Sequence, residues 1–355
     1  MASRTFPLNA WYAAAWRHEV GRGEVLARTV CDRKIALWRK ADGVAVALED
    51  ACWHRLLPLS MGRLDGDNLV CRYHGLAFDA SGRCTRMPSL DKLNPSARVR
   101  SYPVLEKHRF VWVWPGDPAA ADPALVPDLH WNDDPAWEGD GEVLFAKCDY
   151  RLVIDNLMDL THETFVHATS IGHSAIAETP ARTAHDERSV TVERWMLDID
   201  APPFWRTQLG RAGNVDRWQI IRFEPPCSIV LDVGVALAGT GAPQGERSQG
   251  VNGRVLNTIT PETASTCMYF WSLLRSYRLR DQSLTTQLRT ANARIFEEDR
   301  AVLEAQQQSI SARAGESLRN LNIDAGSVWA RRLIERMVES ENQLLMASVL
   351  PRSPG

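Results

Sequence analysis

Three features are missing from the sequence, and each absence argues against a class of partner or cofactor. No apolar run approaches the ~20 residues of a membrane-spanning helix. The formal net charge is only -3, so the composition gives no reason to expect nucleic acid or an anionic membrane surface as a partner. No G-x-G-x-x-G stretch opens a helix after a strand, and we therefore expect the chain not to bind a nicotinamide cofactor itself.

Cysteine is also scarce, with seven residues in a chain of 355. Because the number is odd and two stand in ligand-like positions, we expect no disulfide framework but a reducing compartment, the cytoplasm. The two ligand-like residues are Cys52 and Cys71. The others are expected to be small buried apolar side chains: Cys31, Cys84, Cys148, Cys227 and Cys267.

The length of the chain predicts two domains. Residues 1–118 hold short alternating strands separated by turns, such as 34–40 and 109–116, which is typical of an all-β module. A stretch rich in proline and alanine then indicates a linker, which we assign to residues 119–140. The second domain is expected to span residues 141–355.

Two short clusters of cysteine and histidine lie in the first domain. They are Cys52-x-His54 and Cys71-x-x-His74, so each offers one thiolate and one imidazole. A structural zinc site could use four such ligands, but zinc ribbons usually pair cysteine with cysteine. A Rieske [2Fe–2S] centre places two cysteines on one iron and two histidines on the other, which fits this spacing better. Gly75 directly follows the second cluster and allows backbone amides to approach a sulfide closely.

The second domain is predicted to be a largely antiparallel sheet with two helical stretches, near 155–167 and 284–312. Strand-like stretches are 142–152, 189–199, 216–223, 228–237, 253–261 and 266–277. A sheet wrapped around the long C-terminal helix would enclose a cavity lined by both helices. The predicted fold class is therefore α+β, an all-β domain followed by an antiparallel-sheet domain of the helix-grip, START-like kind.

The stretch DNLMDLTHETFVH, residues 155–167, carries the second set of candidate metal ligands. Asn156, Asp159 and His162 recur every three residues and would share one face of a helix. His162 and His167 are five residues apart, so the helix must end or bulge between them. Two imidazoles beside a carboxylate suit a divalent transition metal. The alternative, two ordinary histidines on an amphipathic helix, leaves the upstream cysteine–histidine clusters unexplained.

Asp299, on the long helix, is predicted to be the third ligand. At ~100° per residue it lies in the middle of an apolar face, with Glu298 near the edge of that face. The apolar neighbours within about 60° are Ile295, Phe296, Val302 and Leu303. A buried carboxylate needs compensation. A metal bound by His162, His167 and Asp299 would supply it, as a 2-His-1-carboxylate triad with open positions on Fe(II). A buried ion pair with arginine, or a helix N-terminus, is the alternative.

With these residues the sequence resembles the Rieske non-haem iron oxygenases along its whole length. The likeness rests on CWH…CRYHG followed by DNLMDLTHETFVH, and it is greatest to members that act on methyl groups of aromatic acids. Further shared stretches are NAWYAAAW (9–16), THETFVHATSIG (161–172), APPFWR (201–206), DRWQIIRF (216–223) and LNIDAG (321–326). The resemblance implies a [2Fe–2S] cluster on Cys52, His54, Cys71 and His74, and mononuclear Fe(II) on His162, His167 and Asp299.

The resemblance also implies a head-to-tail homotrimer. Asp159 matches the family's bridging aspartate, which would link His74 of the partner subunit to His162 of its own chain. Asn156 matches a residue close to the mononuclear iron. One position departs from the family, because Trp53 replaces the usual proline between the first cysteine and histidine. Proline has no amide donor, so Trp53 restores an N–H that bears on the potential and the docking surface of the cluster.

The activity implied by the resemblance is that of the terminal oxygenase component of a monooxygenase system. Electrons would come from NAD(P)H through a separate flavin and iron–sulfur reductase, with O2 as co-substrate. The expected reaction is O-demethylation of a methoxylated aromatic acid, vanillate first, to protocatechuate and formaldehyde. Another methoxy- or methyl-substituted acid, of the toluenesulfonate or dicamba type, is the alternative. A Rieske electron-transfer protein and a lipid-carrier-like binding module are the alternatives from other classes.

The residues expected to contact the substrate are arginines and aromatic residues of the second domain. Candidates for binding a benzoate carboxylate are Arg206, Arg217 and Arg222, because a planar guanidinium suits that group. Trp205 and Phe204 are expected to wall an aromatic pocket, although both are also typical of a core.

Overall fold

The computed structural model describes residues 5–88 and 92–349, and the chain divides into two compact units. Unit 1 comprises residues 1–126, 260–264 and 341–355, and unit 2 comprises residues 127–259 and 265–340. Within the described part of the chain, no helix is long and apolar enough to cross a membrane. The boundaries proposed from composition, at residues 118 and 140, stay a prediction.

Unit 1 contains three small antiparallel sheets among its described residues, in the orders β1-β11-β10, β2-β3-β4-β9 and β5-β6-β7-β8. The strands are β1 (Tyr12–Trp16), β2 (Leu26–Val30), β3 (Arg33–Arg39), β4 (Ala45–Glu49), β5 (Arg63–Asp65), β6 (Asn68–Val70), β7 (Ala77–Phe78), β8 (Cys84–Arg86), β9 (Ser101–Tyr102), β10 (Val104–Lys107) and β11 (Phe110–Val113). Apolar side chains from several of these strands, including Trp38, Leu48 and Phe78, form one core. The loops that follow β4 and β6 carry the cysteine–histidine clusters.

Unit 2 is built on a seven-stranded antiparallel sheet in the order β12-β18-β17-β16-β15-β14-β13. The strands are β12 (Glu138–Ala146), β13 (Arg182–His185), β14 (Val190–Ile199), β15 (Val215–Glu224), β16 (Ser228–Leu237), β17 (Gly250–Thr263) and β18 (Thr266–Arg275). Consecutive strands from β13 to β18 are neighbours, which is a meander, and β12 joins it beside β18. The first strand predicted from the sequence ran too far, because the Asp149 carboxylate accepts from the Arg151 N–H and begins a helix there.

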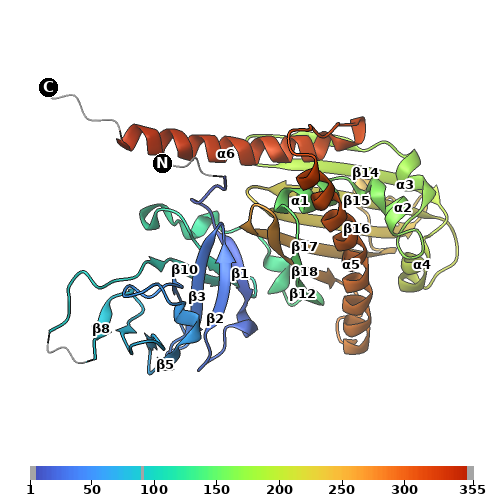
Figure 1. Ribbon diagram of the computed structural model, residues 1–355. Helices are drawn as coiled ribbons and strands as arrows, with labels where there is room; N and C mark the ends of the chain where they lie inside the picture. The colour runs from blue at the N-terminus through green and yellow to red at the C-terminus, as the bar shows by residue number, and fades with distance from the viewer. Residues whose placement is uncertain (1–4, 89–91, 350–355) are drawn as a thin grey trace. The chain divides into compact units, whose positions relative to one another are not determined.

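Helix α5 (Gln282–Ala312) lies across one face of this sheet, together with α1 (Tyr150–Met158) (Figure 1). Successive strand residues point to opposite faces, so Leu231 and Val233 of β16 face the cavity on this side of the sheet. Asp232 between them accepts from the Trp218 indole on the other side. A further long helix, α6 (Ala325–Val349), was not predicted from the sequence.

The segment 155–167 is helical and ends before His167, as expected, but the sequence did not predict a second, earlier break at Asp159. The segment is broken into α1, a 3-10 turn η6 (Leu160–His162) and a short helix α2 (Glu163–Val166). Asp159 separates α1 from η6 with extended backbone angles of φ -128° and ψ 101°. Its backbone N–H donates to the Asp155 carbonyl at the end of α1, and its carboxylate accepts from the Thr161 N–H at 2.9 Å, so one residue ends the helix and begins the next turn.

Candidate metal centres

The break at Asp159 and the end of α2 orient two imidazole rings toward one point. His162 lies in the turn after the break, and its Nδ1 is 2.7 Å from the Asp159 carbonyl oxygen. His167 caps the end of α2, and its Nδ1 is 2.6 Å from Oε2 of Glu298. Carbonyl and carboxylate oxygens only accept hydrogen bonds, so each Nδ1 carries the proton. In this tautomer, the Nε2 of each ring is the nitrogen that can bind a ligand.

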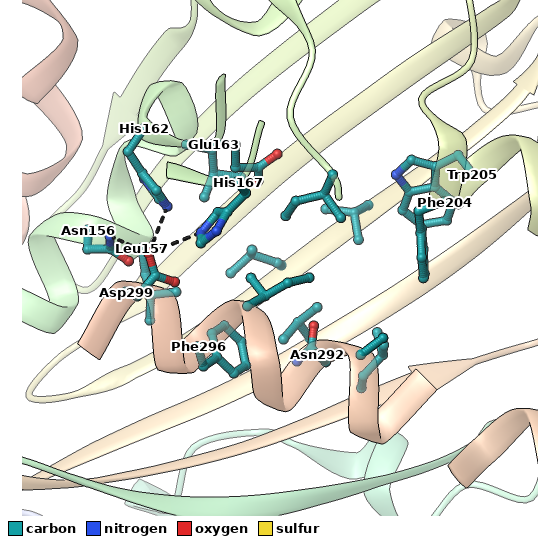
Figure 2. A pocket seen from close by; sticks show the side chains of 18 of the residues that line it. Asn156, Leu157, His162, Glu163, His167, Phe204, Trp205, Asn292, Phe296 and Asp299 are labelled. Carbon is teal, nitrogen blue, oxygen red and sulfur yellow. Dashed lines mark hydrogen bonds and ion pairs between the residues drawn. The ribbon is translucent and has the colours of Figure 1, made fainter. Parts of the chain in front are cut away.

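Both Nε2 atoms converge on the Asp299 carboxylate, as Figure 2 shows. Oδ1 of Asp299 is 3.1 Å from Nε2 of His167 and 3.4 Å from Nε2 of His162. One ligand atom from each residue lies within 4.8 Å of the others. Burial lowers the pKa of the His167 ring, but Asp299 and Glu298 raise it more, and the pKa lies above its usual value. Three electron-pair donors facing one another call for a cation, and this donor set fits a divalent transition metal.

Asp299 lies where the helix pattern placed it, on the buried face of α5 at 5% exposure. Ile295, Phe296 and Leu303 are buried beside it as expected. Val302 is 47% exposed, which corrects the prediction, because the buried stripe is narrower than the apolar one and Val302 is at its edge. Asn156, from α1, donates its Nδ2 hydrogen bond to Oδ1 of Asp299 at 3.1 Å and so helps to orient the carboxylate.

Sequence reasoning missed a buried charge network beneath the histidine segment. Glu163 and Arg217 are 5% and 3% exposed and form an ion pair of 3.0 Å. Gln219 donates to both Glu163 oxygens at 3.0 Å, and Arg217 also donates to the Ile171 carbonyl at 3.3 Å. These contacts fasten the segment that carries both histidines to strand β15. Helix periodicity gives no sign of this network, because the partners belong to different elements.

A largely apolar pocket extends from the metal-ligand residues along α5 (Figure 2). Its apolar lining comes from Leu157, Leu160, Ile171, Phe204, Trp205, Leu231, Val233, Val255, Leu273, Leu288, Ala291, Ile295 and Phe296. Its polar lining comes from Asn156, His162, Glu163, His167, Arg217, Asn292 and Asp299. The pocket therefore suits a flat apolar molecule with few polar substituents.

Two of the proposed carboxylate-binding arginines do not reach this pocket. Arg206, half exposed, is paired with Asp200 at 2.6 Å, and exposed Arg222 is paired with Glu224 at 2.9 Å. Each lies on the surface because a local carboxylate holds it there, which corrects the expectation. Arg217 does line the pocket, although its charge is already compensated by the ion pair described above. Phe204 and Trp205, on α4 (Pro203–Leu209), lie in the pocket wall as expected.

In unit 1, the two cysteine–histidine loops have the same backbone hydrogen-bond pattern. In each loop the cysteine N–H donates to the carbonyl five residues later, at 2.8–2.9 Å. The N–H four residues after the cysteine donates back to the cysteine carbonyl, also at 2.8–2.9 Å. That fourth residue is Leu56 in one loop and Gly75 in the other, and both have left-handed backbone angles, φ +58° and +72°. The loops are thus two copies of one turn.

The paired loops separate the two kinds of side chain. Cys52 and Cys71 are buried in the apolar core of the unit, with 1% and 2% exposure. His54 and His74 are exposed, and their ring centroids are 4.6 Å apart. Two inward thiols and two outward imidazoles on matching loops fit a cluster with cysteines on one iron and histidines on the other.

Comparisons with known proteins identify the family of the chain. Residues 10–103 match the Rieske [2Fe-2S] domain, and residues 146–340 match the vanillate O-demethylase oxygenase C-terminal domain. Over 353 residues the chain is 42% identical to a vanillate O-demethylase oxygenase subunit of Pseudomonas sp. (strain HR199 / DSM 7063). The match covers 98% of this chain and 99% of that relative. The chain belongs to the Rieske non-haem iron oxygenases.

Solved structures of another oxygenase in this family have the same fold. Dicamba monooxygenase bound to 3,6 dichlorosalicylic acid has a TM-score of 0.89 and 33% identity, with 96% of this chain and 99% of that chain covered. Dicamba monooxygenase with non-heme iron and dicamba has a TM-score of 0.82, with the same identity and coverage. The α+β fold class expected from the sequence is confirmed. The expected cofactors, a Rieske [2Fe–2S] cluster and mononuclear iron, are those of this family of oxygenases.

Proposed function

We propose that this Rieske non-haem iron oxygenase removes the methyl group of a methoxylated aromatic acid, with vanillate as the first candidate. The observation that carries the proposal is the convergence of His162, His167 and Asp299 at one end of an apolar pocket walled by Phe204 and Trp205. The Pseudomonas relative described above is named vanillate O-demethylase oxygenase subunit. The products would be protocatechuate and formaldehyde, and other methoxy- or methyl-substituted aromatic acids are the alternative substrates.

The proposal assigns ligand roles to seven side chains. Cys52, His54, Cys71 and His74 would hold the [2Fe–2S] cluster, and His162, His167 and Asp299 would hold the mononuclear Fe(II). When bound, the cluster would supply single electrons and the mononuclear iron would activate dioxygen. Three protein ligands would leave coordination positions open for dioxygen. The hydrogen bonds donated by the two Nδ1 atoms fix the tautomer and the orientation of each imidazole, with Nε2 toward the metal position.

The remaining pocket residues would bind the substrate and exclude water. Leu157, Leu160 and Ile171 line the pocket together with the ligand residues and form an apolar surround. A dry surround strengthens every electrostatic contact inside it and limits loss of reactive species to solvent. Phe204 and Trp205 offer aromatic faces to the substrate ring. Asn156 holds the Asp299 carboxylate in its ligating orientation through the 3.1 Å hydrogen bond.

Asp159 is proposed to connect the two metal centres between subunits. Its carboxylate, partly exposed, already holds the turn that presents His162, through the Thr161 N–H. In a homotrimer, Asp159 would also contact His74 of the partner subunit. The oxygenase would receive electrons from a separate flavin and iron–sulfur reductase that oxidises NAD(P)H, and it would work in the cytoplasm.

Turnover of vanillate tests the proposal directly. Iron-loaded protein, a Rieske-type reductase and NADH are supplied with vanillate, and formaldehyde, protocatechuate and oxygen consumption are measured together. Equal amounts of both products, with matching oxygen uptake, support the proposal. Oxygen uptake without either product rejects vanillate as the substrate and directs the assay to other methoxy- and methyl-benzoates. The variant Asp299→Ala is the control, because it should keep the cluster absorbance and yield no product.

Iron content distinguishes an oxygenase from a Rieske electron carrier. An oxygenase holds one iron beyond the two of the cluster, whereas a carrier holds only the cluster. Loss of one iron of three in His162→Ala, with the cluster absorbance retained, is the expected result. Wild-type protein with only two irons per chain after iron loading would favour the carrier.

A further inference from the structure

One polar group in the pocket has no partner within the protein. Asn292 lines the pocket from α5, and its Nδ2 is buried without a hydrogen-bond partner. Nδ2 of Asn156 is bonded to Asp299, and the Arg217 and Glu163 side chains bond to each other. A buried amide N–H without an acceptor is unfavourable, and in a binding pocket a ligand oxygen can satisfy it.

The position of Asn292 relative to the metal ligands is fixed by one helix. It precedes Asp299 by seven residues, so it lies two turns away on the same face of α5, ~10.5 Å along the helix axis. Figure 2 shows Asp299 near one end of the drawn stretch of α5, with Phe296 between it and Asn292. The pocket thus has metal ligands at one end and an amide donor two helical turns away, with apolar side chains between them. This spacing suits a single benzene ring with one substituent at the metal ligands and another at the amide.

The charges around the pocket argue against an ion pair with the substrate acid. Arg217 is the arginine in the described pocket wall, and it is already bonded to Glu163 at 3.0 Å. Breaking that pair would leave a carboxylate buried without its counter-charge, which is strongly unfavourable. The substituent of the substrate ring that lies away from the metal ligands is therefore recognised by a neutral hydrogen-bond donor. An amide N–H donates to a carboxylate, an amide carbonyl or an aldehyde oxygen alike.

We propose that Asn292 determines substrate orientation, donating its amide N–H to an oxygen on the ring substituent remote from the reacting methoxyl. The hydrogen bond sets the ring so that the methoxyl lies at the His162, His167 and Asp299 end. This assignment rests on the proposed demethylation. It implies that a neutral carbonyl analogue such as vanillamide is accepted beside vanillate, whereas guaiacol, which lacks that substituent, gains nothing from Asn292.

Two variants of Asn292 separate a hydrogen bond from a charge effect. Asn292→Leu removes the donor at similar volume, and Asn292→Asp replaces it with a carboxylate that repels vanillate but accepts from the vanillamide N–H. For Asn292→Leu we expect kcat/KM for vanillate and vanillamide to fall by about 10- to 100-fold, with guaiacol unchanged. For Asn292→Asp we expect vanillate turnover to be lost and vanillamide turnover to remain. Gln287→Leu, which also replaces an amide side chain by leucine but at an exposed position on α5, is the control.

Binding without turnover separates failure of this assignment from failure of the proposed function. Titration calorimetry of vanillate into the holoenzyme, with no reductase present, should show a Kd raised by Asn292→Leu and unchanged by Gln287→Leu. If wild type makes no formaldehyde but shows this pattern, the orientation role stands and the demethylation is rejected. If the Kd of Asn292→Leu equals that of wild type, or wild type does not bind vanillate, the role of Asn292 is overturned.

Discussion

Nδ1 of His167 lies 2.6 Å from Oε2 of Glu298, the residue directly before Asp299 on helix α5. One turn of helix therefore offers a carboxylate to the metal position and a second carboxylate to the back of a histidine ligand. A carboxylate on the far nitrogen fixes the tautomer and raises the basicity of the ligating nitrogen. Glu298 is 44% exposed at its side chain, so its role depends on this contact rather than on burial.

The first prediction concerns Glu298. Glu298→Gln is expected to weaken retention of the mononuclear iron by about 10- to 100-fold, because a neutral amide orients His167 less firmly. Competition with an iron chelator, followed by iron analysis, measures the change while the cluster absorbance serves as an internal reference. Glu297→Gln, at the exposed neighbouring position, is the control. Equal iron loss from both variants would show that Glu298 does not support the site.

The second prediction concerns the buried ion pair beneath the histidine segment. Glu163→Leu leaves the Arg217 guanidinium buried without its counter-charge, and we expect the free energy of unfolding to fall by about 3–5 kcal/mol. Urea unfolding of the holoprotein measures the loss. The double variant Glu163→Leu, Arg217→Met removes both charges and is expected to recover much of it. A double variant no more stable than the single one would contradict this account.

The third prediction uses the repeated turn of the two cysteine–histidine loops. Gly75→Ala is expected to cost about 1–2 kcal/mol, because a side chain at φ +72° is strained and its Cβ would lie 3.1 Å from Cγ of Pro88. The cluster absorbance should then bleach faster in the presence of a chelator. Leu56→Gly changes the equivalent residue of the other loop in the opposite direction. The cluster absorbance of Leu56→Gly should bleach no faster than that of wild type. Faster bleaching would show that Leu56 and Gly75 are not equivalent positions of the two loops.

The fourth prediction concerns alkaline stability. Burial raises the pKa of the Cys227 thiol to about 12. Between its unfolded value of about 8.5 and that folded value, the unfolded chain loses the thiol proton and the folded chain keeps it. Stability is therefore unaffected below pH ~8.5 and falls by about 1.4 kcal/mol per pH unit above it. The variant Cys227→Ala has no thiol to ionise at this position, so its free energy of unfolding does not fall for this reason.

Unfolding free energies at pH 7.5 and pH 10 test this effect. The difference between wild type and Cys227→Ala should shift by about 2 kcal/mol in favour of the variant at the higher pH. Other titrating groups are common to both proteins and cancel in the difference. Parallel pH profiles would show that the thiol is accessible to ionisation in the folded state.

The sequence predicted those parts of the structure that a local pattern determines. The alternating strands of unit 2 and the depth of Asp299 follow from periods of 2 and 3.6 residues, and both are confirmed. The cysteine–histidine clusters were found because their spacing is set by a short turn that needs no partner elsewhere. The presence of His162 and His167 in one segment made them candidates before any contact was known.

Contacts between distant elements could not be predicted in the same way. At Asp159 the carboxylate caps the following turn by accepting from the Thr161 N–H. This local hydrogen bond competes with continuation of the helix, and packing against other elements decides which of the two forms. Arg206 and Arg222 looked suitable for an acid by residue type alone, but nearby carboxylates hold both on the surface. Glu163 is buried because Arg217 and Gln219 of another element face it. A one-dimensional pattern contains no information on such partners.

Helix α5 carries both Asp299 and Asn292 on one face, and a helix is stiff over two turns. The distance between the hydrogen-bond donor and Asp299 can be changed only by placing the donor at another position on the same face of α5. Successive positions on that face are about one turn, ~5.4 Å, apart. Leu288 and Ile295 occupy the neighbouring positions. Substrate length in this scaffold is thus a discrete quantity, and redesign toward longer or shorter aromatic acids would proceed one helical turn at a time.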